Sequence, residues 1–483
     1  MNTKLIKNTS LYTIGNIIPK ILAMVLLPVF TRYLTPGEYG ILNYTNSIIS
    51  FLYVLSLLSL NTFILRYYFK MENKIERKRL IGNISLFLLI YNFILLFLEL
   101  ILAPIVIDYF SIKVAFKPYF LLALLNNFLN LFAVVPLIIF RLKEKALKFL
   151  ILNLSKTLFS YGFSLFFIVV LDYGVLGRYY ANILASIIFL LVYIYIIYKN
   201  AIFNINMKQI KTALKFSFPL VPGAFSYMII NLLDRIMLER FVPLDQMGIY
   251  SIGYTLGFAI NVFVQGAYHA FEPLFFKNYG NDNFGYIYTK IKSHYFSLAI
   301  LLGFGVSIFS REIILIFTTP DYLKAYKIVP LIVIAAIFKA KYLVEATVTI
   351  ASSNNKIITF ATFGGALINI IVNLLFMPKI GIYAAALSTI ASFVFITIVI
   401  NILNYRYEKF KDTLLFKDFI SITIFVIFIV AVLVLINVTT IYTIIVKVLI
   451  LLLYSIIVKK IYNIKLKNFI NNLINKVGEN DVN

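Results

Sequence analysis

The chain has 483 residues, of which 61% are hydrophobic and 13% are charged, and it contains neither cysteine nor tryptophan. Soluble proteins carry about 25% charged residues, so this composition excludes a soluble globular domain. The formal net charge of +24 fits either nucleic acid or an anionic membrane surface. Since no polar segment is long enough to fold into a nucleic-acid-binding domain, we favour the membrane. The absence of cysteine excludes disulfide bonds.

Apolar segments of membrane-spanning length run along the chain, because a bilayer core of about 30 Å requires roughly 20 apolar residues per helix. We predict fourteen spans. The first six cover residues 9–31, 41–68, 81–107, 117–140, 148–171 and 175–198. The next six cover residues 213–239, 249–271, 291–317, 326–351, 357–377 and 380–404, and the last two cover 419–437 and 441–459.

The predicted fold is therefore an all-α polytopic membrane protein with about 14 transmembrane helices. Its predicted parts are two six-helix lobes at 1–198 and 213–404, followed by two C-terminal helices at 419–459. A polar joint at 199–215 separates the lobes, a basic joint at 405–418 precedes the last two helices, and a Lys- and Asn-rich tail covers 460–483.

The distribution of Lys and Arg predicts the orientation. KMENKIERKR at 70–79 and RLKEKALK at 141–148 both follow an even-numbered span. Cytoplasmic loops are enriched in Lys and Arg, so these segments predict a cytoplasmic N-terminus. An even number of spans then places both termini in the cytoplasm. Most of the basic charge is thus explained by topology.

A short motif occurs twice, once in each predicted lobe. TRYLTPGEYGIL at 31–42 aligns without a gap with ERFVPLDQMGIY at 239–250, which places Arg32 on Arg240 and Gly40 on Gly248. Both copies end the first span of a lobe and begin the next, which predicts a parallel repeat of two pseudo-symmetric lobes with a substrate path between them. The alternative is chance similarity of two apolar hairpins. We expect the glycines to permit a tight turn and the prolines to lie in a loop.

The first span contains polar residues near its middle, where ionisable groups are costly and mark candidate sites. Pro19 is expected to bend this helix. Lys20, with Asn16 nearby, is expected to face a cavity where a cation could bind a phosphate. The alternative is that Lys20 extends to the inner surface.

The seventh span carries the corresponding polar group, Asn231, Asp234, Arg235 and Glu239. Adjacent residues of a helix lie about 100° apart, so we expect Asp234 and Arg235 to occupy different faces. Arg235 could pair with Glu239 at four residues' spacing. Either the group is a structural ion pair, or Arg235 faces the path and Asp234 either holds Arg235 in place or binds a coupling ion.

Further charges occur at the span ends and in the tenth span. Arg32 and Arg240 lie at the outer ends of their spans, as interface anchors or as docking cations. In the tenth span Lys341 and Glu345 are expected to pair, which makes Lys339 the candidate cation. Lys156 and Glu99 are isolated in the sequence, and no partner is predicted for them.

Asparagines are frequent in spans two and four, at positions 43, 46, 61, 126, 127 and 130. Their amides suit sugar hydroxyls and also connect helices within a membrane; the second role is favoured. Asn16, Asn127 and Asn231 are predicted to line the cavity.

Several function classes lack their sequence signals. No GxxxxGK[ST] loop occurs, which argues against ATP hydrolysis, and two His without any Cys cannot supply a metal cluster. No cofactor is predicted, apart from coupling to an H⁺ or Na⁺ gradient. The outer loops are short, which disfavours an enzyme that joins sugars.

Two segments resemble one known family. They are LYTIGNIIPKILAMVLLPVFTRYLTPGEYGILNY at 11–44 and FPLVPGAFSYMIINLLDRIMLERFVPLDQMGIYSIGYTLG at 218–257. The chain resembles the polysaccharide flippases (Wzx or RfbX type) of the multidrug/oligosaccharidyl-lipid/polysaccharide exporter superfamily. The shared features are Arg32, Gly40, the Asp234-Arg235 pair and Gly248-Ile249-Tyr250.

The resemblance implies a non-enzymatic transporter of a bacterial inner membrane with two lobes in a V and a cationic cavity between them. Its substrate would be undecaprenyl-diphosphate-linked oligosaccharide for O-antigen, capsule or a similar surface polysaccharide. Polysaccharide polymerase and chain-length proteins would be its partners. Burying a diphosphate requires cations, for which Lys20, Arg235 and Lys339 are the candidates. Asp234 and Glu345 are candidates for ion coupling.

Two alternatives belong to other classes. A cation-coupled multidrug exporter of the same superfamily would favour carboxylates along the path, whereas cations predominate within these spans. A membrane glycosyl polymerase or ligase would be an enzyme and would lack the repeat.

Overall fold

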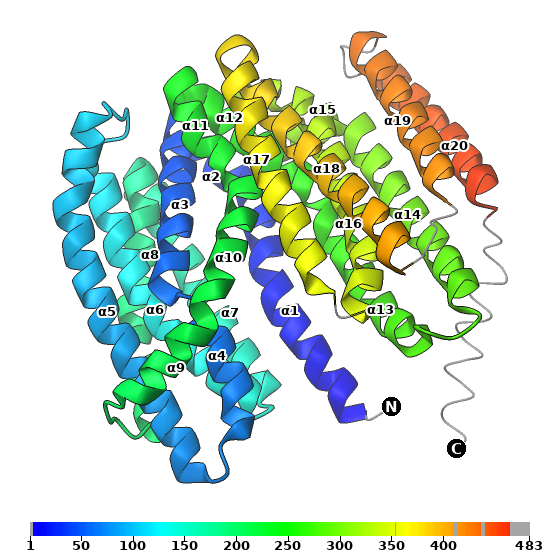
Figure 1. Ribbon diagram of the computed structural model, residues 1–483. Coiled ribbons are helices and arrows are strands. Elements are labelled where there is room, and N and C mark those ends of the chain that lie inside the picture. The colour runs from blue at the N-terminus through cyan, green and yellow to red at the C-terminus, as the bar shows by residue number, and fades with distance from the viewer. Residues whose placement is uncertain (1–2, 353, 409–413, 436–439, 464–483) are drawn as a thin grey trace. The chain divides into compact units, whose positions relative to one another are not determined.

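The structure is a computed structural model that describes residues 3–352, 354–408, 414–435 and 440–463. Within these residues all regular elements are helices (Figure 1), which confirms the predicted all-α class. Residues 409–413 of the predicted basic joint and residues 464–483 of the predicted tail lie outside the described residues.

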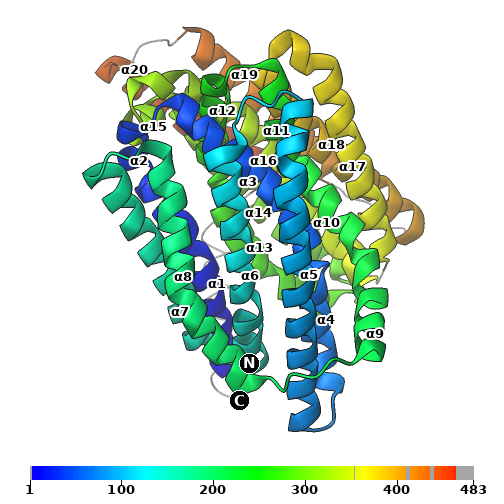
Figure 2. The ribbon, with the colours of Figure 1, turned by 90° about the vertical axis from the view of Figure 1, so that its left-hand side faces the viewer.

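Contacts between residues divide the chain into two compact units, residues 2–251 and residues 252–483, called here the N-terminal and C-terminal units. The N-terminal unit contains α1 (Thr3–Val25), α2 (Leu27–Tyr33), α3 (Pro36–Leu57), α4 (Leu60–Tyr67), α5 (Lys74–Tyr109), α6 (Leu121–Leu142), α7 (Ala146–Leu165), α8 (Gly174–Asn200), α9 (Met207–Ser217), α10 (Val221–Met228) and α11 (Asp234–Phe241). In this unit α1 packs on α7, and α8 packs on both α6 and α7 (Figure 2).

The division falls inside α12 (Leu244–Phe258). The C-terminal unit continues with α13 (Ile260–Asn278), α14 (Phe284–Ile308), α15 (Ser310–Phe317), α16 (Val329–Ala351), α17 (Asn355–Ile380), α18 (Ile382–Glu408), α19 (Leu415–Leu435) and α20 (Ile441–Tyr462). The predicted lobes were defined by the count of spans and the polar joint at 199–215, and their boundaries stay a prediction.

The chain is a multi-pass integral membrane protein. In the described ranges twelve helices are long and apolar enough to cross a bilayer, or thirteen if the bent pair Leu11–Val25 and Leu27–Tyr33 is one span. Fourteen were predicted. Helix α16, the predicted tenth span, has 23 residues but carries Lys339, Lys341 and Glu345, all of them buried. Its charges are enclosed by protein, so it does not have the composition of a lipid-facing helix.

The bend of the first span lies elsewhere than predicted. Helix α1 passes through Pro19 without a break, and the axis turns by 42° between Val25 and Leu27. Pro28 lies in the first turn of α2, where its missing N–H costs no helical hydrogen bond. Pro19 therefore does not interrupt the helix, and the 42° bend follows Val25.

The first copy of the repeated motif forms a helix start rather than a loop. Thr35 caps α3: its side chain accepts from the N–H of Glu38, and the Glu38 carboxylate accepts from the N–H of Thr35 at 2.9 Å. This reciprocal capping box satisfies two N–H groups that the first helical turn leaves unpaired. The other Glu38 oxygen accepts from the N–H of Val175 at 3.0 Å, which fixes the start of α3 to the start of α8.

The two motif glycines allow close helix packing, and the expected turn role is wrong. A Cβ on Gly40 would lie 2.2 Å from the carbonyl oxygen of Leu244, and a Cβ on Gly248 would lie 1.8 Å from that of Pro36. The repeat that aligns Gly40 with Gly248 also aligns Pro36 with Leu244. The contact is therefore reciprocal: each copy of the motif places the same glycine against the same helix start of the other copy.

Candidate substrate cavity

A polar cavity of about 670 Å³ lies within the N-terminal unit. Helices α3, α4, α6, α7 and α8 form its walls, with one residue from α10. Its lining is rich in amides and contains two cations: Asn46, Ile49, Ser50, Tyr53, Leu57, Asn61, Leu65, Asn126, Asn127, Asn130, Ala133, Val134, Leu137, Ile138, Arg141, Asn153, Lys156, Tyr193 and Met228. None of these lining residues, as far as the chain is described, is Asp or Glu.

Helix α6 supplies three of the amides because residues four apart share one face of a helix. Asn126 and Asn130 both accept from the hydroxyl of Ser186 on α8, at 3.1 and 3.4 Å. Asn127 is buried and lies 3.5 Å from the Ser56 hydroxyl. The amides therefore connect helices, as favoured from the sequence, and the same side chains line the cavity.

Lys156 on α7 is one of the two cations that line the cavity. Its ammonium donates to the side-chain oxygen of Asn130 on α6, a neutral amide. One turn before it, Asn153 donates to the carbonyl of Gly15 at 2.7 Å, which connects α7 to α1. Arg141, near the end of α6, places its guanidinium 4.8 Å from the centre of the Phe149 ring.

This lining suits a ligand that carries both hydroxyl groups and negative charge. Asparagine amides donate and accept hydrogen bonds, so they match hydroxyls in either role. An ammonium held among neutral groups at membrane depth is stabilised by an anionic partner, because its desolvation is otherwise uncompensated.

The residues predicted from the sequence are distributed over several places. Asn127 lies in the cavity lining. Lys20 and Asn16 are exposed on α1 and are not among the lining residues. Arg32 and Arg240 are exposed; Arg240 donates to the carbonyl of Phe110 at 2.5 Å.

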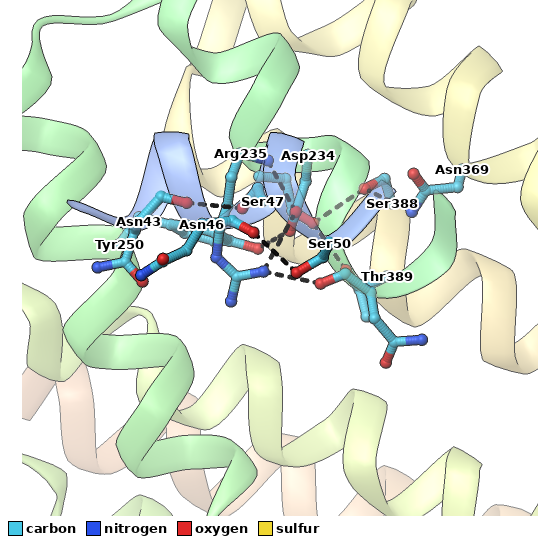
Figure 3. Close-up of polar contacts among 12 residues, drawn as sticks. Asn43, Asn46, Ser47, Ser50, Asp234, Arg235, Tyr250, Asn369, Ser388 and Thr389 are labelled. Atoms are coloured by element: carbon cyan, nitrogen blue, oxygen red, sulfur yellow. Dashed lines mark hydrogen bonds and ion pairs between the residues drawn. The ribbon is translucent and has the colours of Figure 1, made fainter. Parts of the chain in front are cut away.

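Asp234 and Arg235 form a buried pair in the N-terminal unit (Figure 3). The guanidinium lies 3.8 Å from the Asp234 carboxylate, so the two neighbouring side chains form an ion pair with each other. The same carboxylate accepts from the hydroxyl of Tyr250 on α12. Glu239, the other predicted partner of Arg235, accepts from the backbone N–H of Lys113 at 2.7 Å.

An irregular helical turn directly precedes this pair. Residues 229–233 form a π-helical turn directly before α11, and such turns release backbone carbonyls and often occur at functional sites. Arg235 donates to the carbonyl of Asn231 at 2.8 Å, so its side chain folds back along the turn. The buried Asn231 amide donates to the carbonyl of Tyr227 at 2.7 Å.

The C-terminal unit contains a buried ionic cluster of its own. Lys341 lies 2.9 Å from Glu345, which confirms the expected pair. Lys292 of α14 lies 3.4 Å from Glu345 and 3.2 Å from Asp418 of α19, and Tyr462 of α20 donates to Asp418 at 2.7 Å. The cluster therefore connects the last two helices to α14 and α16. Lys339 lies apart, 4.6 Å from the centre of the Phe258 ring.

Replacing Asp418 with Asn is expected to destabilise the C-terminal unit by about 3–5 kcal/mol, because it removes a carboxylate between two buried lysines. Thermal unfolding of the purified protein measures this. Asp321→Asn is the matched control, since Asp321 is exposed, and it should change stability by less than about 0.5 kcal/mol. Equal shifts in both variants would show that the cluster does not hold α19 and α20 to α14 and α16.

Lys156 and Arg141 were not predicted as site residues. The position of Lys156 at mid-span was a signal, but its partner Asn130 is 26 residues away on another helix. Sequence spacing alone does not bring α6 and α7 into register.

Comparison with known proteins identifies two matching families and a related membrane protein. The model of the family described as "Polysaccharide biosynthesis protein" matches residues 5–279, and the MatE family model matches residues 219–375. Together they confirm the predicted superfamily, while the Wzx type stays a prediction. A Haemophilus influenzae protein described as an uncharacterized membrane protein is 24% identical over 305 residues, which are 62% of this chain and 70% of that protein.

Solved structures share the fold. The chain is similar to the lipid II flippase MurJ in an inward closed conformation, with a TM-score of 0.71, 18% identity, and coverage of 96% of this chain and 99% of that one. It is also similar to an inward-facing multidrug resistance MATE family transporter, with a TM-score of 0.63, 13% identity, and coverage of 82% and 94%.

Proposed function

The chain belongs to the polysaccharide biosynthesis protein family, and on this premise we propose that it is a flippase for undecaprenyl-diphosphate-linked oligosaccharide repeat units. It would move them from the cytoplasmic to the outer leaflet of a bacterial inner membrane by alternating access, for O-antigen, capsule or a similar surface polysaccharide. Polysaccharide polymerase and chain-length proteins are the proposed partners.

The observation that supports this function most directly is the amide- and cation-lined cavity of the N-terminal unit. Sugars present many hydroxyls, which the asparagines can bind in either role, and a diphosphate provides the negative charge that Lys156 would neutralise. The proposed orientation has both termini in the cytoplasm, as the Lys and Arg distribution predicts.

Lys156→Gln should reduce transport about 10- to 100-fold, because a hydrogen bond to a charged group contributes about 1.5–3 kcal/mol. Restoration of surface polysaccharide in a flippase-deficient strain, with membrane levels of each variant measured, tests this. Lys148→Gln is the matched control, since Lys148 is exposed on the same helix and outside the lining. Wild-type polysaccharide with Lys156→Gln would remove Lys156 from the site.

Lys20, Arg235 and Lys339 remain proposed substrate contacts, and Arg32 and Arg240 remain proposed docking cations. For Lys20 the supporting feature is its exposure on α1. Lys20→Ala and Arg235→Ala should abolish surface polysaccharide while the protein still inserts. Normal polysaccharide levels in either variant would show that the changed residue does not contact the substrate.

Asp234 and Glu345 remain proposed H⁺ or Na⁺ coupling groups. Transport that persists after both gradients are collapsed would contradict coupling.

A multidrug exporter is the second candidate, because the MatE family model matches residues 219–375. Cationic drugs require anionic sites, whereas the ionisable groups in the cavity lining are Lys156 and Arg141, apart from tyrosines. Efflux of a cationic dye by the reconstituted protein, unaffected by Lys156→Gln, would favour the exporter.

A further inference from the structure

A second cavity in the N-terminal unit has an opposite, apolar character. Its volume is about 260 Å³, and it lies among α5, α6 and α8. Phe128, Leu131 and Phe132 of α6 form one wall. Leu89 and Tyr198 at its rim are exposed, so the cavity opens onto the surface of the unit. In the most apolar stretch of α5 only 11% of the residues are buried, as expected of a helix that faces lipid.

One end of this cavity is bounded by the segment that connects α8 to α9. Gly82 allows the segment to lie directly on α5, since a Cβ there would lie 2.1 Å from the carbonyl oxygen of Ile202. The N–H of Ile202 donates to the carbonyl of Lys78 at 2.9 Å, and Asn83 donates to the carbonyl of Asn206 at 3.1 Å. These contacts fix Phe203, which lines the cavity.

Four exposed lysines gather at the same end: Lys78 of α5, Lys143 and Lys145 between α6 and α7, and Lys199 of α8. Partial burial, and then the charges of Lys145, Lys78 and Lys199, lower the pKa of Lys143, as expected where these lysines lie near it. Lys143 donates to the side chain of Asn200. Glu144 is the acidic residue of this loop, so the group keeps a net positive charge.

The lysines lie close to the apolar lining along the chain. Lys199 directly follows Tyr198 at the rim of the cavity. Lys78 precedes the lining residue Ser85 by seven residues, or about 10 Å along α5. An apolar cavity that begins within this distance of a cationic group fits a molecule with a phosphate attached to a hydrocarbon chain.

We propose that this cavity and the four lysines form a binding site for an anionic glycerophospholipid of the surrounding bilayer. One acyl chain occupies the apolar cavity, and the phosphate lies among Lys78, Lys143, Lys145 and Lys199. A free phosphate would leave the cavity empty, and a neutral lipid would leave the lysines uncompensated. The site is separate from the amide-lined cavity, and it does not depend on the identity of the transported substrate.

The absence of tryptophan from the chain permits a direct test. Phe128→Trp places the chain's single tryptophan in the apolar cavity, and excitation at the red edge of the absorption band avoids the tyrosines. The full-length variant is reconstituted in vesicles of phosphatidylcholine that contain a minor fraction of phosphatidylglycerol, with bromine on the acyl chains of one lipid or the other. Phe97→Trp is the matched control, since Phe97 is 62% exposed on α5 and lies 19 residues, about 28 Å, beyond Lys78.

Brominated phosphatidylglycerol should quench the fluorescence of the Phe128→Trp protein well beyond its mole fraction, whereas the Phe97→Trp protein should be quenched in proportion to composition. Juxtamembrane lysines contribute about fivefold each to the affinity for anionic lipid. Changing the four lysines to Gln in the Phe128→Trp protein should therefore remove the preference. Changing Lys208, Lys211 and Lys215 of α9, which are also exposed, should leave the preference for phosphatidylglycerol unchanged. Lys156→Gln should leave it unchanged as well.

Three results would overturn the site: proportional quenching at position 128, equal loss of preference in both lysine variants, or displacement of the brominated lipid by inorganic phosphate alone. Leu131→Trp, from the same wall, provides a second reporter if Phe128→Trp does not yield folded protein. The preference and polysaccharide transport are measured separately, so failure of one leaves the other standing.

Discussion

Replacing Gly248 with Ala is expected to lower the thermal stability of the protein strongly and to reduce surface polysaccharide with it. The new Cβ would lie 1.8 Å from the carbonyl oxygen of Pro36, and both sides of this contact are backbone. No flexible side chain can move away, so α3 and α12 must separate. Overpacking of this kind costs about 1–3 kcal/mol and occasionally more. Thermal unfolding in detergent and the yield of monodisperse protein measure the effect.

The matched control, Gly162→Ala, is expected to change the stability in the opposite direction. Gly162 lies within α7, and a Cβ there would meet no atom within 4 Å, so Gly162→Ala should stabilise the protein by up to about 1 kcal/mol. Gly40→Ala should resemble Gly248→Ala, because its Cβ would lie 2.2 Å from Leu244. The double variant should cost less than the sum, since one separation relieves both clashes. Wild-type stability of Gly248→Ala would contradict the reciprocal contact.

Replacing Asp234 with Ala is the second change with a large expected effect. It removes a fully buried carboxylate that lies 3.8 Å from the Arg235 guanidinium and accepts from the N–H of Arg235 at 2.8 Å. Leaving a buried charge without its counter-ion costs about 3–5 kcal/mol. Guanidinium desolvation then opposes folding, so we expect a low unfolding temperature.

A double substitution separates charge from packing. Asp234→Leu with Arg235→Met replaces the ion pair with apolar groups and should recover most of the stability. Transport should stay lost in that stable double variant if Asp234 binds a coupling ion or if Arg235 contacts the substrate, and Asp234→Asn with Arg235 retained separates these two roles. Asp282→Ala, at an exposed carboxylate, should behave as wild type. Normal transport in the double variant would leave Asp234 with a structural role alone.

The fold could be predicted from the sequence because the length and composition of apolar segments decide which helices cross a bilayer. The Lys341–Glu345 pair could also be predicted from the sequence, since residues four apart on one helix are neighbours. Helix α16 did not have the apolar composition expected of the tenth span. Its charges are paired within the protein, Glu345 with Lys292 of α14 and Lys341 with Asp418 of α19.

The candidate cavity was less predictable because its contacts join distant parts of the chain. Lys156 meets Asn130 across two helices, and no local spacing encodes this. The contact of Arg235 with the carbonyl of Asn231 was not predicted either, because the π turn at residues 229–233 has no clear signal in the sequence. Gly40 looked like a turn residue in a TPGEYG segment. Its role depends on the carbonyl of Leu244, which is 204 residues further along (244 minus 40).

The reciprocal contact of Gly40 and Gly248 also bears on ancestry. If the two motif copies arose by duplication, each would meet the other through equivalent atoms, as two copies of one ancestral chain inserted in the same orientation would. Fusion would in that case keep an interface that the separate copies already had. The fused chain would have inherited a constraint as well: neither glycine can acquire a side chain unless the opposite helix start retreats, so the two halves are bound to evolve together at this point.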